Sequence, residues 1–178
     1  MAKPLILIAA SIPVILAILI AIPMITNPQI PFNAANADDR IAVELTKHQI
    51  KKVSFGVTDR ITPQKTEIFL VSNDGDVRYL VTADGVPEPE KKLAIAKSDV
   101  KKITALVKET GFMHLPIDSI PPDEQIAEYT KFSLKITLNG QTKQIQWVEQ
   151  NATSTFVPPI LTQVELNLEG LLNKTTQR

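Results

Sequence analysis

The side chains that could do chemistry are few and lie far apart in the sequence. The chain has no cysteine and only two histidines, His48 and His114. A catalytic serine or threonine needs an activating base within hydrogen-bond reach, and neither histidine stands in a motif that supplies such a partner. Phosphate-binding glycine loops, nucleophile elbows and HExxH helices are also absent from the sequence. We therefore predict no catalytic residues and a protein that is not an enzyme.

Two acidic stretches have the residue types of a metal site. His114 precedes Asp118, Asp123 and Glu124, but their irregular spacing in a loop with prolines favours a solvated loop. The segment SNDGDV, residues 72–77, lacks the remaining ligands of an EF-hand loop and suits a turn. We predict neither a metal nor a cofactor. A pocket around His114 and these acids is the alternative in which the protein binds a small ligand or acts as an enzyme.

The charge balance bears on the class of partner. Lysine plus arginine and aspartate plus glutamate both number 19, so the formal net charge is zero. Such a chain has no overall field to attract nucleic acid, and we predict no nucleic-acid partner. Because disulfides are excluded, the folded part of the chain must be stabilised by a packed core.

Residues 4–25 form an apolar stretch that contains no charged residue. As a helix at ~1.5 Å per residue the stretch reaches ~33 Å, enough to cross a hydrocarbon layer of ~30 Å. Lys3 precedes it, and the next charges are Asp38 and Asp39, so the positive-inside rule places the N-terminus in the cytoplasm. We predict a transmembrane signal-anchor over residues 1–26, a single-pass protein of the cell membrane, and a domain outside.

The sequence NAANADD, residues 33–39, gives the alternative of a cleaved signal peptide. Ala35 and Ala37 form the A-x-A pattern of a signal peptidase site. However, the apolar run is longer than the roughly 7 to 15 residues of a cleavable signal. The pattern also lies about a dozen residues beyond the end of that run. We predict that residues 27–40 are an extended stalk; cleavage after Ala37 would instead make the protein secreted.

Periodicity and turn signals predict an α+β domain over residues 41–174, followed by a short tail, 175–178. Alternating apolar residues from Ile41 onward favour a strand, although the same residues could share a helix face. A helix is predicted to begin at a capping Ser98 and to stop at Gly111. Its buried stripe would be Val100, Ile103, Leu106 and Val107. A closing helix is predicted from Pro159, with Leu161, Val164, Leu168 and Leu171 on its apolar side.

Two β-hairpins are indicated by dipeptides that suit two-residue type I′ turns. With Asn139-Gly140 as the loop, Phe132 pairs with Trp147, Leu134 with Ile145, and Ile136 with Lys143. With Asp74-Gly75 as the loop, Phe69 pairs with Leu80, Leu70 with Tyr79, and Ile68 with Val81. Both faces of this first hairpin carry apolar residues. The hairpin therefore either lies in a sheet that is covered on both sides or presents an outer patch to a partner. For the second case we predict an interaction patch formed by Phe69, Val71 and Leu80.

These elements predict an antiparallel sheet of four to six strands with two helices on one face. Two N-x-[ST] sequons, at Asn151 and Asn173, are possible glycosylation sites if the domain is exposed outside the cell. The most consistent function is a non-catalytic, membrane-anchored interaction domain outside the cytoplasm. It would bind a protein partner, as an accessory subunit of a membrane complex does.

The order of the elements also resembles a known family. The run LVKETGFMHLP, a proline-rich loop, the hairpin EYTKFSLKITLNGQTKQIQWVEQ and the closing VPPILTQVELNLEGLL resemble emfourin-like domains, over about residues 50–172. Those small α+β proteins include inhibitors of thermolysin-like metallopeptidases. The resemblance implies the α+β fold. It also implies a second function, a proteinaceous inhibitor of a metallopeptidase.

Overall fold

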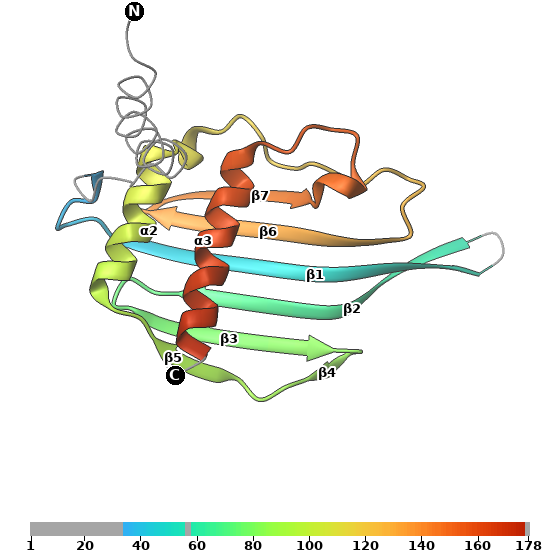
Figure 1. The fold of residues 1–178 in the computed structure, drawn as a ribbon, viewed down its shortest axis with the longest axis horizontal. Coiled ribbons are helices and arrows are strands. Elements are labelled where there is room, and N and C mark those ends of the chain that lie inside the picture. The colour runs from blue at the N-terminus through green and yellow to red at the C-terminus, as the bar shows by residue number, and fades with distance from the viewer. Residues whose placement is uncertain (1–33, 56–57, 177–178) are drawn as a thin grey trace, which may run out of the picture. The chain divides into compact units, whose positions relative to one another are not determined.

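A single antiparallel sheet of seven strands forms one layer of the computed structural model, which describes residues 34–55 and 58–176 (Figure 1). The strand order is β4-β3-β2-β1-β6-β7, and β5 pairs with β3. The strands are β1 (Ile41–Phe55), β2 (Thr58–Val71), β3 (Asp76–Ala83), β4 (Val86–Pro87), β5 (Lys91–Ala94), β6 (Glu128–Leu138) and β7 (Gln141–Val148). The predicted α+β class is confirmed. The sheet has more strands than predicted because β4 and β5 form in the stretch that follows the first hairpin.

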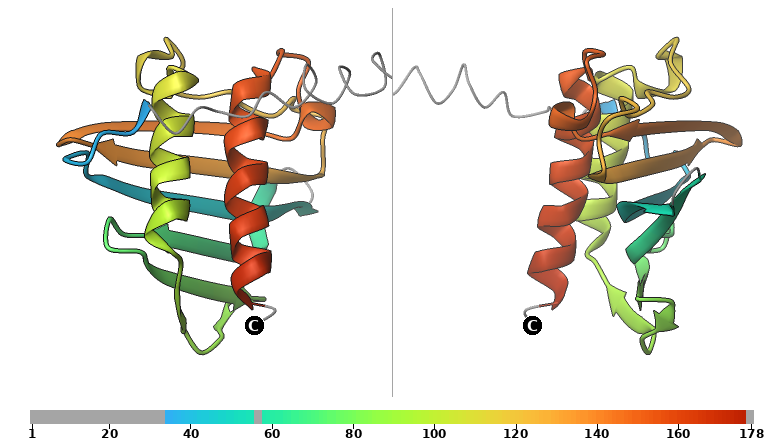
Figure 2. Two further views of the ribbon diagram at one scale, coloured as in Figure 1. Left: turned by 60° about the vertical axis from the view of Figure 1, so that its left-hand side comes forward. Right: turned by 90° about the vertical axis from the view of Figure 1, so that its right-hand side faces the viewer.

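Two α-helices, α2 (Lys97–Glu109) and α3 (Pro159–Thr176), cover one face of the sheet, as predicted (Figure 2). Two short 3-10 helices, η2 (Phe112–His114) and η3 (Gln150–Ala152), lie in the connecting loops. Gly111 has φ +66°, the left-handed conformation that ends a helix and that glycine adopts without strain. The predicted cap is wrong, because α2 begins one residue before Ser98 and its N-cap, Ala96, makes no side-chain bond.

The core lies between the helices and the sheet. In the first part of β1 every second residue points towards the helices, and Ile41, Val43 and Leu45 are 2, 2 and 5 % exposed. The strand interpretation of this segment is therefore confirmed. The predicted helix stripes are buried too, apart from Leu171, which is half-buried. Facing them are buried residues of the neighbouring strands, namely Phe69, Val71, Val77, Val81, Phe132, Leu134, Ile136, Ile145 and Trp147.

The hairpin of β6 and β7 has the predicted register. Phe132 pairs with Trp147, and the turn residues Asn139 and Gly140 have φ +51° and +83°. Both central residues of a type I′ turn require positive φ, which asparagine and glycine adopt most readily. The rings of Phe132 and Trp147 stack with their centroids 5.4 Å apart.

The hairpin of β2 and β3 differs from the prediction by one residue. Val71 pairs with Val77 and Phe69 with Tyr79, so Phe69 does not face Leu80. The loop has three residues, Asn73 to Gly75, and the Gly75 N–H donates to the Ser72 carbonyl at 3.0 Å. This is the geometry of a type I turn followed by a residue with positive φ, here Gly75 at +95°.

Two tertiary contacts determine this three-residue loop. Asn73 Oδ1 accepts a hydrogen bond from the Ile41 N–H at 3.1 Å. The Gly75 carbonyl accepts one from the Ile95 N–H at 2.9 Å. A Cβ atom on Gly75 would lie 2.5 Å from the Ile95 carbonyl oxygen, so only glycine fits there. The loop therefore places Asn73 where it holds the start of β1.

The predicted transmembrane segment, residues 1–26, lies outside the described residues, as does the first half of the predicted stalk, residues 27–33. In the part of the chain that the structure describes, no helix is long and apolar enough to cross a membrane. The last stalk residues, 34–40, belong to the same compact unit as the sheet and helices. The folded domain therefore starts earlier than residue 41.

Candidate functional site

A cleft of about 240 Å³ opens between the sheet and the C-terminal half of α3. Its floor comes from β1, β2 and β3, and its wall comes from α3. The cleft combines apolar side chains with a cluster of charged ones, the mixture typical of small-ligand sites. The lining residues are Leu45, Lys47, Glu67, Phe69, Tyr79, Leu168, Glu169, Leu172 and Asn173.

Lys47 is the centre of the charged cluster. It follows Leu45 on the helix-covered face of β1 and lies opposite Glu67 of β2 and Phe132 of β6. Its Nζ donates to Glu169 Oε1 of α3 at 2.7 Å and lies 5.6 Å from the centroid of the Phe132 ring. Burial lowers the pKa of Lys47, but the bond to Glu169 and the nearby carboxylates outweigh it and raise the pKa above its ordinary value. Lys47 is therefore a cation that fastens α3 to the sheet.

Glu67 and Tyr79 form the second part of the cluster. The Tyr79 hydroxyl donates to Glu67 Oε1 at 2.5 Å, and Lys65 lies 3.0 Å from the same oxygen. Burial raises the pKa of Glu67, yet the bonds from Tyr79 and Lys65 bring it below its ordinary value. Burial and the bond to Glu67 raise the pKa of Tyr79, so the phenol remains protonated. The phenol is therefore a hydrogen-bond donor here and not a base.

Among the carboxyl groups of the described residues, Glu165 has a pKa far above its ordinary value. It belongs to α3 and is 7 % exposed. Burial, followed by the charge of Glu169, raises its pKa to about 7, and Lys47 opposes that shift. Glu165 therefore exchanges its proton near neutral pH, inside the contact between helix and sheet.

Glu165 makes the stability of the fold depend on pH. Its pKa is about 7 when folded and about 4.5 when unfolded, so between these values the folded chain holds a proton that the unfolded chain has released. The free energy of unfolding should then fall as pH rises from 4.5 to 7, by on the order of 2 kcal/mol. Glu165→Gln should abolish most of this slope. Urea unfolding of the full chain in mild detergent, followed by Trp147 fluorescence, measures it.

The control for this prediction is Glu109→Gln, because Glu109 lies exposed on α2. That variant should keep the wild-type slope. Equal slopes for wild type and Glu165→Gln would show that Glu165 does not titrate in this window.

The groups of this cluster bind one another, which limits their chemistry. Among the described residues, no buried side-chain nitrogen or oxygen lacks a hydrogen-bond partner. In the same part of the chain, no group of three or more metal-ligating side chains is placed to hold an ion. The cluster therefore has the arrangement of a polar clamp between α3 and the sheet. The sequence indicates this cluster by charged residues at positions that face the core. Lys47 continues the apolar alternation that begins at Ile41, and Glu165 lies beside the apolar stripe of α3.

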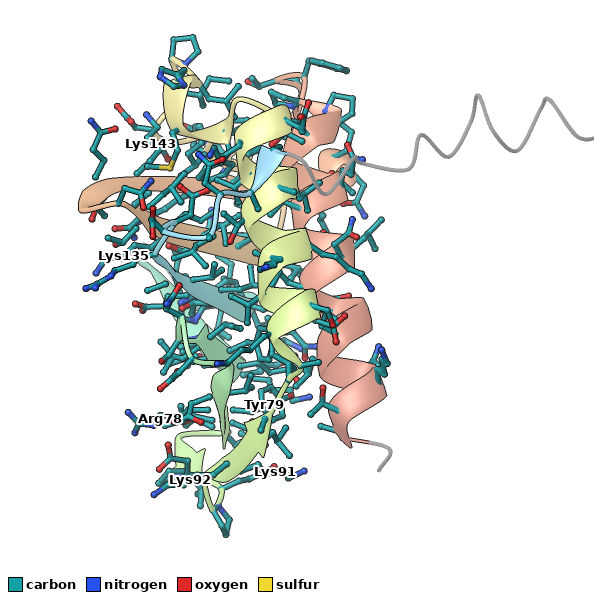
Figure 3. All side chains as sticks on the ribbon, turned by 90° about the vertical axis from the view of Figure 1, so that its left-hand side faces the viewer. Arg78, Tyr79, Lys91, Lys92, Lys135 and Lys143 are labelled. Atoms are coloured by element: carbon teal, nitrogen blue, oxygen red, sulfur yellow. The ribbon has the colours of Figure 1, made fainter. Side chains whose placement is uncertain are left out.

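The opposite face of the sheet carries no helix within the described residues (Figure 2). Ile68 pairs with Leu80 on this face, and Leu70 lies beside them. All three side chains are half-buried. Basic residues surround this aliphatic centre, and Figure 3 shows Arg78, Lys92 and Lys135 pointing away from the helices. We call this surface the uncovered face and define it by Ile68, Leu70, Arg78, Leu80, Lys92, Lys131 and Lys135.

Some basic residues of the uncovered face form ion pairs with described residues and others do not. Arg78 forms an ion pair with Glu90. Lys131 and Lys135 of β6 make no ion pair with any described residue, although Lys135 lies opposite Glu44 in the ladder. His48, also on this face, bonds Thr66 Oγ1 at 2.9 Å. Burial, followed by the charge of Lys131, lowers its pKa. The face therefore presents unpaired positive charge beside aliphatic side chains.

The structure separates the residues of the predicted interaction patch. Phe69 and Val71 are 3 and 2 % exposed on the helix-covered face, so neither can contribute to a surface patch. Leu80 lies on the uncovered face with Ile68 and Leu70. The error follows from the hairpin register, because a slip of one residue moves a side chain to the other face of the sheet.

The remaining predicted residues lie apart from one another. His114 is exposed at the end of η2, and the acids of the loop after it do not join it in a metal-binding group of described residues. Both sequon asparagines are exposed, Asn151 in η3 and Asn173 on α3. No protein-family model and no curated protein matches the chain.

Proposed function

We propose that the protein is a non-catalytic interaction domain, held at the cell membrane by residues 4–25, that binds a protein partner through the uncovered face. One observation carries the proposal. Within the described residues, helices cover only one side of the sheet, and the other side combines an aliphatic centre with two lysines, Lys131 and Lys135, that form no ion pair in this part of the chain. Aliphatic side chains surrounded by charge are a common arrangement in transient protein interfaces.

The charges of the uncovered face indicate the chemistry of the partner. Lys131 and Lys135 would gain ion pairs from a partner that places carboxylates opposite β6. Aliphatic side chains of the same partner would cover Ile68 and Leu80. Such charges direct the rate and specificity of association more than its affinity, so the interaction should weaken as salt increases. An accessory subunit beside a larger membrane protein fits this description.

A capture experiment tests the proposal. The full chain is used to capture partners from detergent-solubilised native membranes, and the amount of each captured protein is compared with that of the variant Ile68→Glu/Leu80→Glu. We expect the double variant to lose the partner at least tenfold, because two buried carboxylates would oppose an apolar contact. Lys131→Glu/Lys135→Glu should reduce capture and its dependence on salt.

The matched control is Leu166→Glu, which changes a leucine that is 58 % exposed on α3. It should capture as much partner as wild type. A partner that all variants retain equally would exclude the uncovered face. The inhibitor function would be favoured instead if the full chain inhibited a thermolysin-like peptidase and Ile68→Glu/Leu80→Glu left that inhibition unchanged.

A further inference from the structure

The alternative cleavage site after Ala37 lies in a folded turn. The Asp39 N–H donates to the Asn36 carbonyl at 3.3 Å, which makes Ala37 and Asp38 the central residues of a β-turn. The bond that a signal peptidase would cut after Ala37 is therefore the central peptide bond of this turn.

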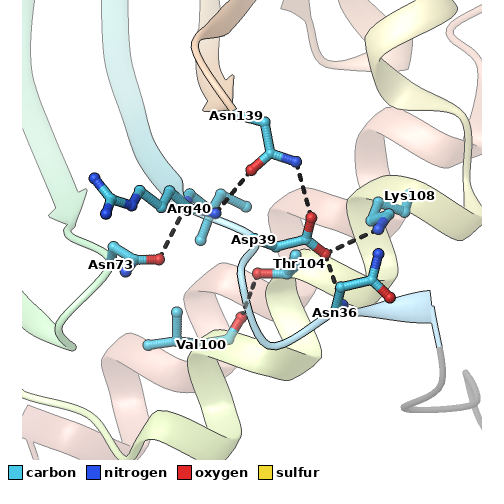
Figure 4. Close-up of polar contacts among 9 residues, drawn as sticks. Asn36, Asp39, Arg40, Asn73, Val100, Thr104, Lys108 and Asn139 are labelled. Atoms are coloured by element: carbon cyan, nitrogen blue, oxygen red, sulfur yellow. Dashed lines mark hydrogen bonds and ion pairs between the residues drawn. The ribbon is translucent and has the colours of Figure 1, made fainter.

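The Asp39 carboxylate fastens this turn to the domain (Figure 4). Its Oδ2 accepts hydrogen bonds from the Asn36 N–H at 2.7 Å and from Lys108 Nζ at 2.8 Å. Its Oδ1 accepts one from Asn139 Nδ2 at 2.8 Å. The side chain is 6 % exposed. The bonds from Asn139 and Lys108 lower the pKa of Asp39 to about 2, so the carboxylate stays ionised at every physiological pH.

Asn139 secures the next residue as well. Its Oδ1 accepts a hydrogen bond from the Arg40 N–H, and its own N–H donates to the Arg40 carbonyl, both at 2.9 Å. Asn139 belongs to the rigid type I′ turn between β6 and β7, and Lys108 belongs to the last turn of α2. Residues 36–40 are thus held by two elements that are distant in sequence. We call this set of contacts the Asp39 clamp, formed by Asn36, Asp39, Arg40, Lys108 and Asn139.

We propose that folding of the domain closes the Ala37–Asp38 bond to proteolytic processing. A protease that binds its substrate as an added strand needs several extended residues on each side of the cut. The Asp39 clamp holds this segment in a turn, so cleavage requires the clamp to open first. The site is then a substrate for signal peptidase only before the domain folds, and a chain that folds first keeps its N-terminal segment.

The clamp also predicts what cleavage before folding would leave. Hydrolysis adds water across the bond and produces a carboxylate on Ala37 and an ammonium group on Asp38. The bonds of Asp39 to Lys108 and Asn139 lie on the C-terminal side of the cut, so the released domain keeps them. Of the bonds that form the Asp39 clamp, the two to Asn36 are lost. Both forms would share one domain, and the order of folding and cleavage decides which form is made.

Elastase, which cuts after small residues such as alanine, is a suitable probe. The folded full chain in mild detergent and a synthetic peptide of residues 30–45 are digested in parallel, and mass spectrometry follows the fragment that begins at Asp38. We expect the bond in the folded chain to be cut at least tenfold more slowly than in the peptide. Asn139→Gly and Lys108→Ala weaken the clamp without changing the sequence at the cut, and each should accelerate cleavage at least threefold.

Lys101→Ala is the matched control, because Lys101 lies exposed on the same helix as Lys108. It should be cut at the wild-type rate. Circular dichroism identifies any variant that fails to fold, and the comparison of folded wild type with peptide does not depend on variants. Cleavage of the folded wild type as fast as the peptide would overturn the proposal. So would cleavage of both folded clamp variants, Asn139→Gly and Lys108→Ala, at the wild-type rate.

Discussion

Replacing Trp147 by alanine should lower the free energy of unfolding by about 4 kcal/mol. Trp147 is 2 % exposed and is among the largest fully enclosed side chains of the described residues. Its ring stacks on Phe132 with an interplanar angle of 17°. Truncation removes this contact and leaves a cavity that the strands of an antiparallel sheet cannot close by small shifts. Urea unfolding of the full chain, followed by circular dichroism, measures the change.

Phe156→Ala is the aromatic control for this measurement. Phe156 is 71 % exposed in the loop before α3, so its truncation should change the free energy of unfolding by less than about 0.5 kcal/mol. Similar losses in both variants would contradict the placement of Trp147 in the core.

Replacing Lys47 by methionine is expected to cost about 2 to 3 kcal/mol of stability at pH 8. Methionine preserves much of the apolar packing, so the loss reports on the charge. Without Lys47, the carboxylates of Glu67, Glu165 and Glu169 remain close together, and Lys65 compensates the charge of Glu67. Glu165 has a pKa of about 7, so at pH 5 it is neutral and the loss should be clearly smaller. The loss of stability is smaller at pH 5 because a neutral Glu165 leaves one carboxylate fewer without a counter-ion.

Lys143→Met is the matched control, because Lys143 pairs with Asp118, whose side chain is 88 % exposed. An ion pair with so exposed a carboxylate contributes at most about 1 kcal/mol. A double-mutant cycle of Lys47→Met and Glu169→Gln should give a coupling of at least about 1 kcal/mol. A coupling near zero would mean that the 2.7 Å contact between these two side chains does not fasten α3.

The two hairpins show how far local sequence carries a prediction. Asn139-Gly140 occupies both central positions of a type I′ turn, and the alternation of the flanking strands agrees with that turn. The register of β6 and β7 therefore follows from neighbours in sequence. Asp74-Gly75 carries the same type of signal, but Asn73 bonds the start of β1 and Gly75 bonds Ile95. These contacts between distant segments outweigh the local preference and change the register by one residue.

The polar cluster under α3 is a second feature beyond local sequence. Lys47 and Glu169 are separated by 122 residues. Sequence alone shows that Lys47 interrupts an inward apolar alternation, but it does not show which acid compensates the charge. That partner depends on which strand lies under which turn of α3. The raised pKa of Glu165 likewise requires the burial that only the packed helix produces.

The sequence by itself determined the α+β class, both helices and the second hairpin, because hydrophobic period and turn chemistry are local properties. It favoured the strand at Ile41 without excluding a helix. It also located the apolar segment and the A-x-A pattern before the domain. Only the tertiary structure decided that Asp39 belongs to the fold, because its partners lie 69 and 100 residues away at Lys108 and Asn139. Contacts over such separations depend on the arrangement of strands and helices, and that arrangement converts the end of the predicted stalk into a clamped turn.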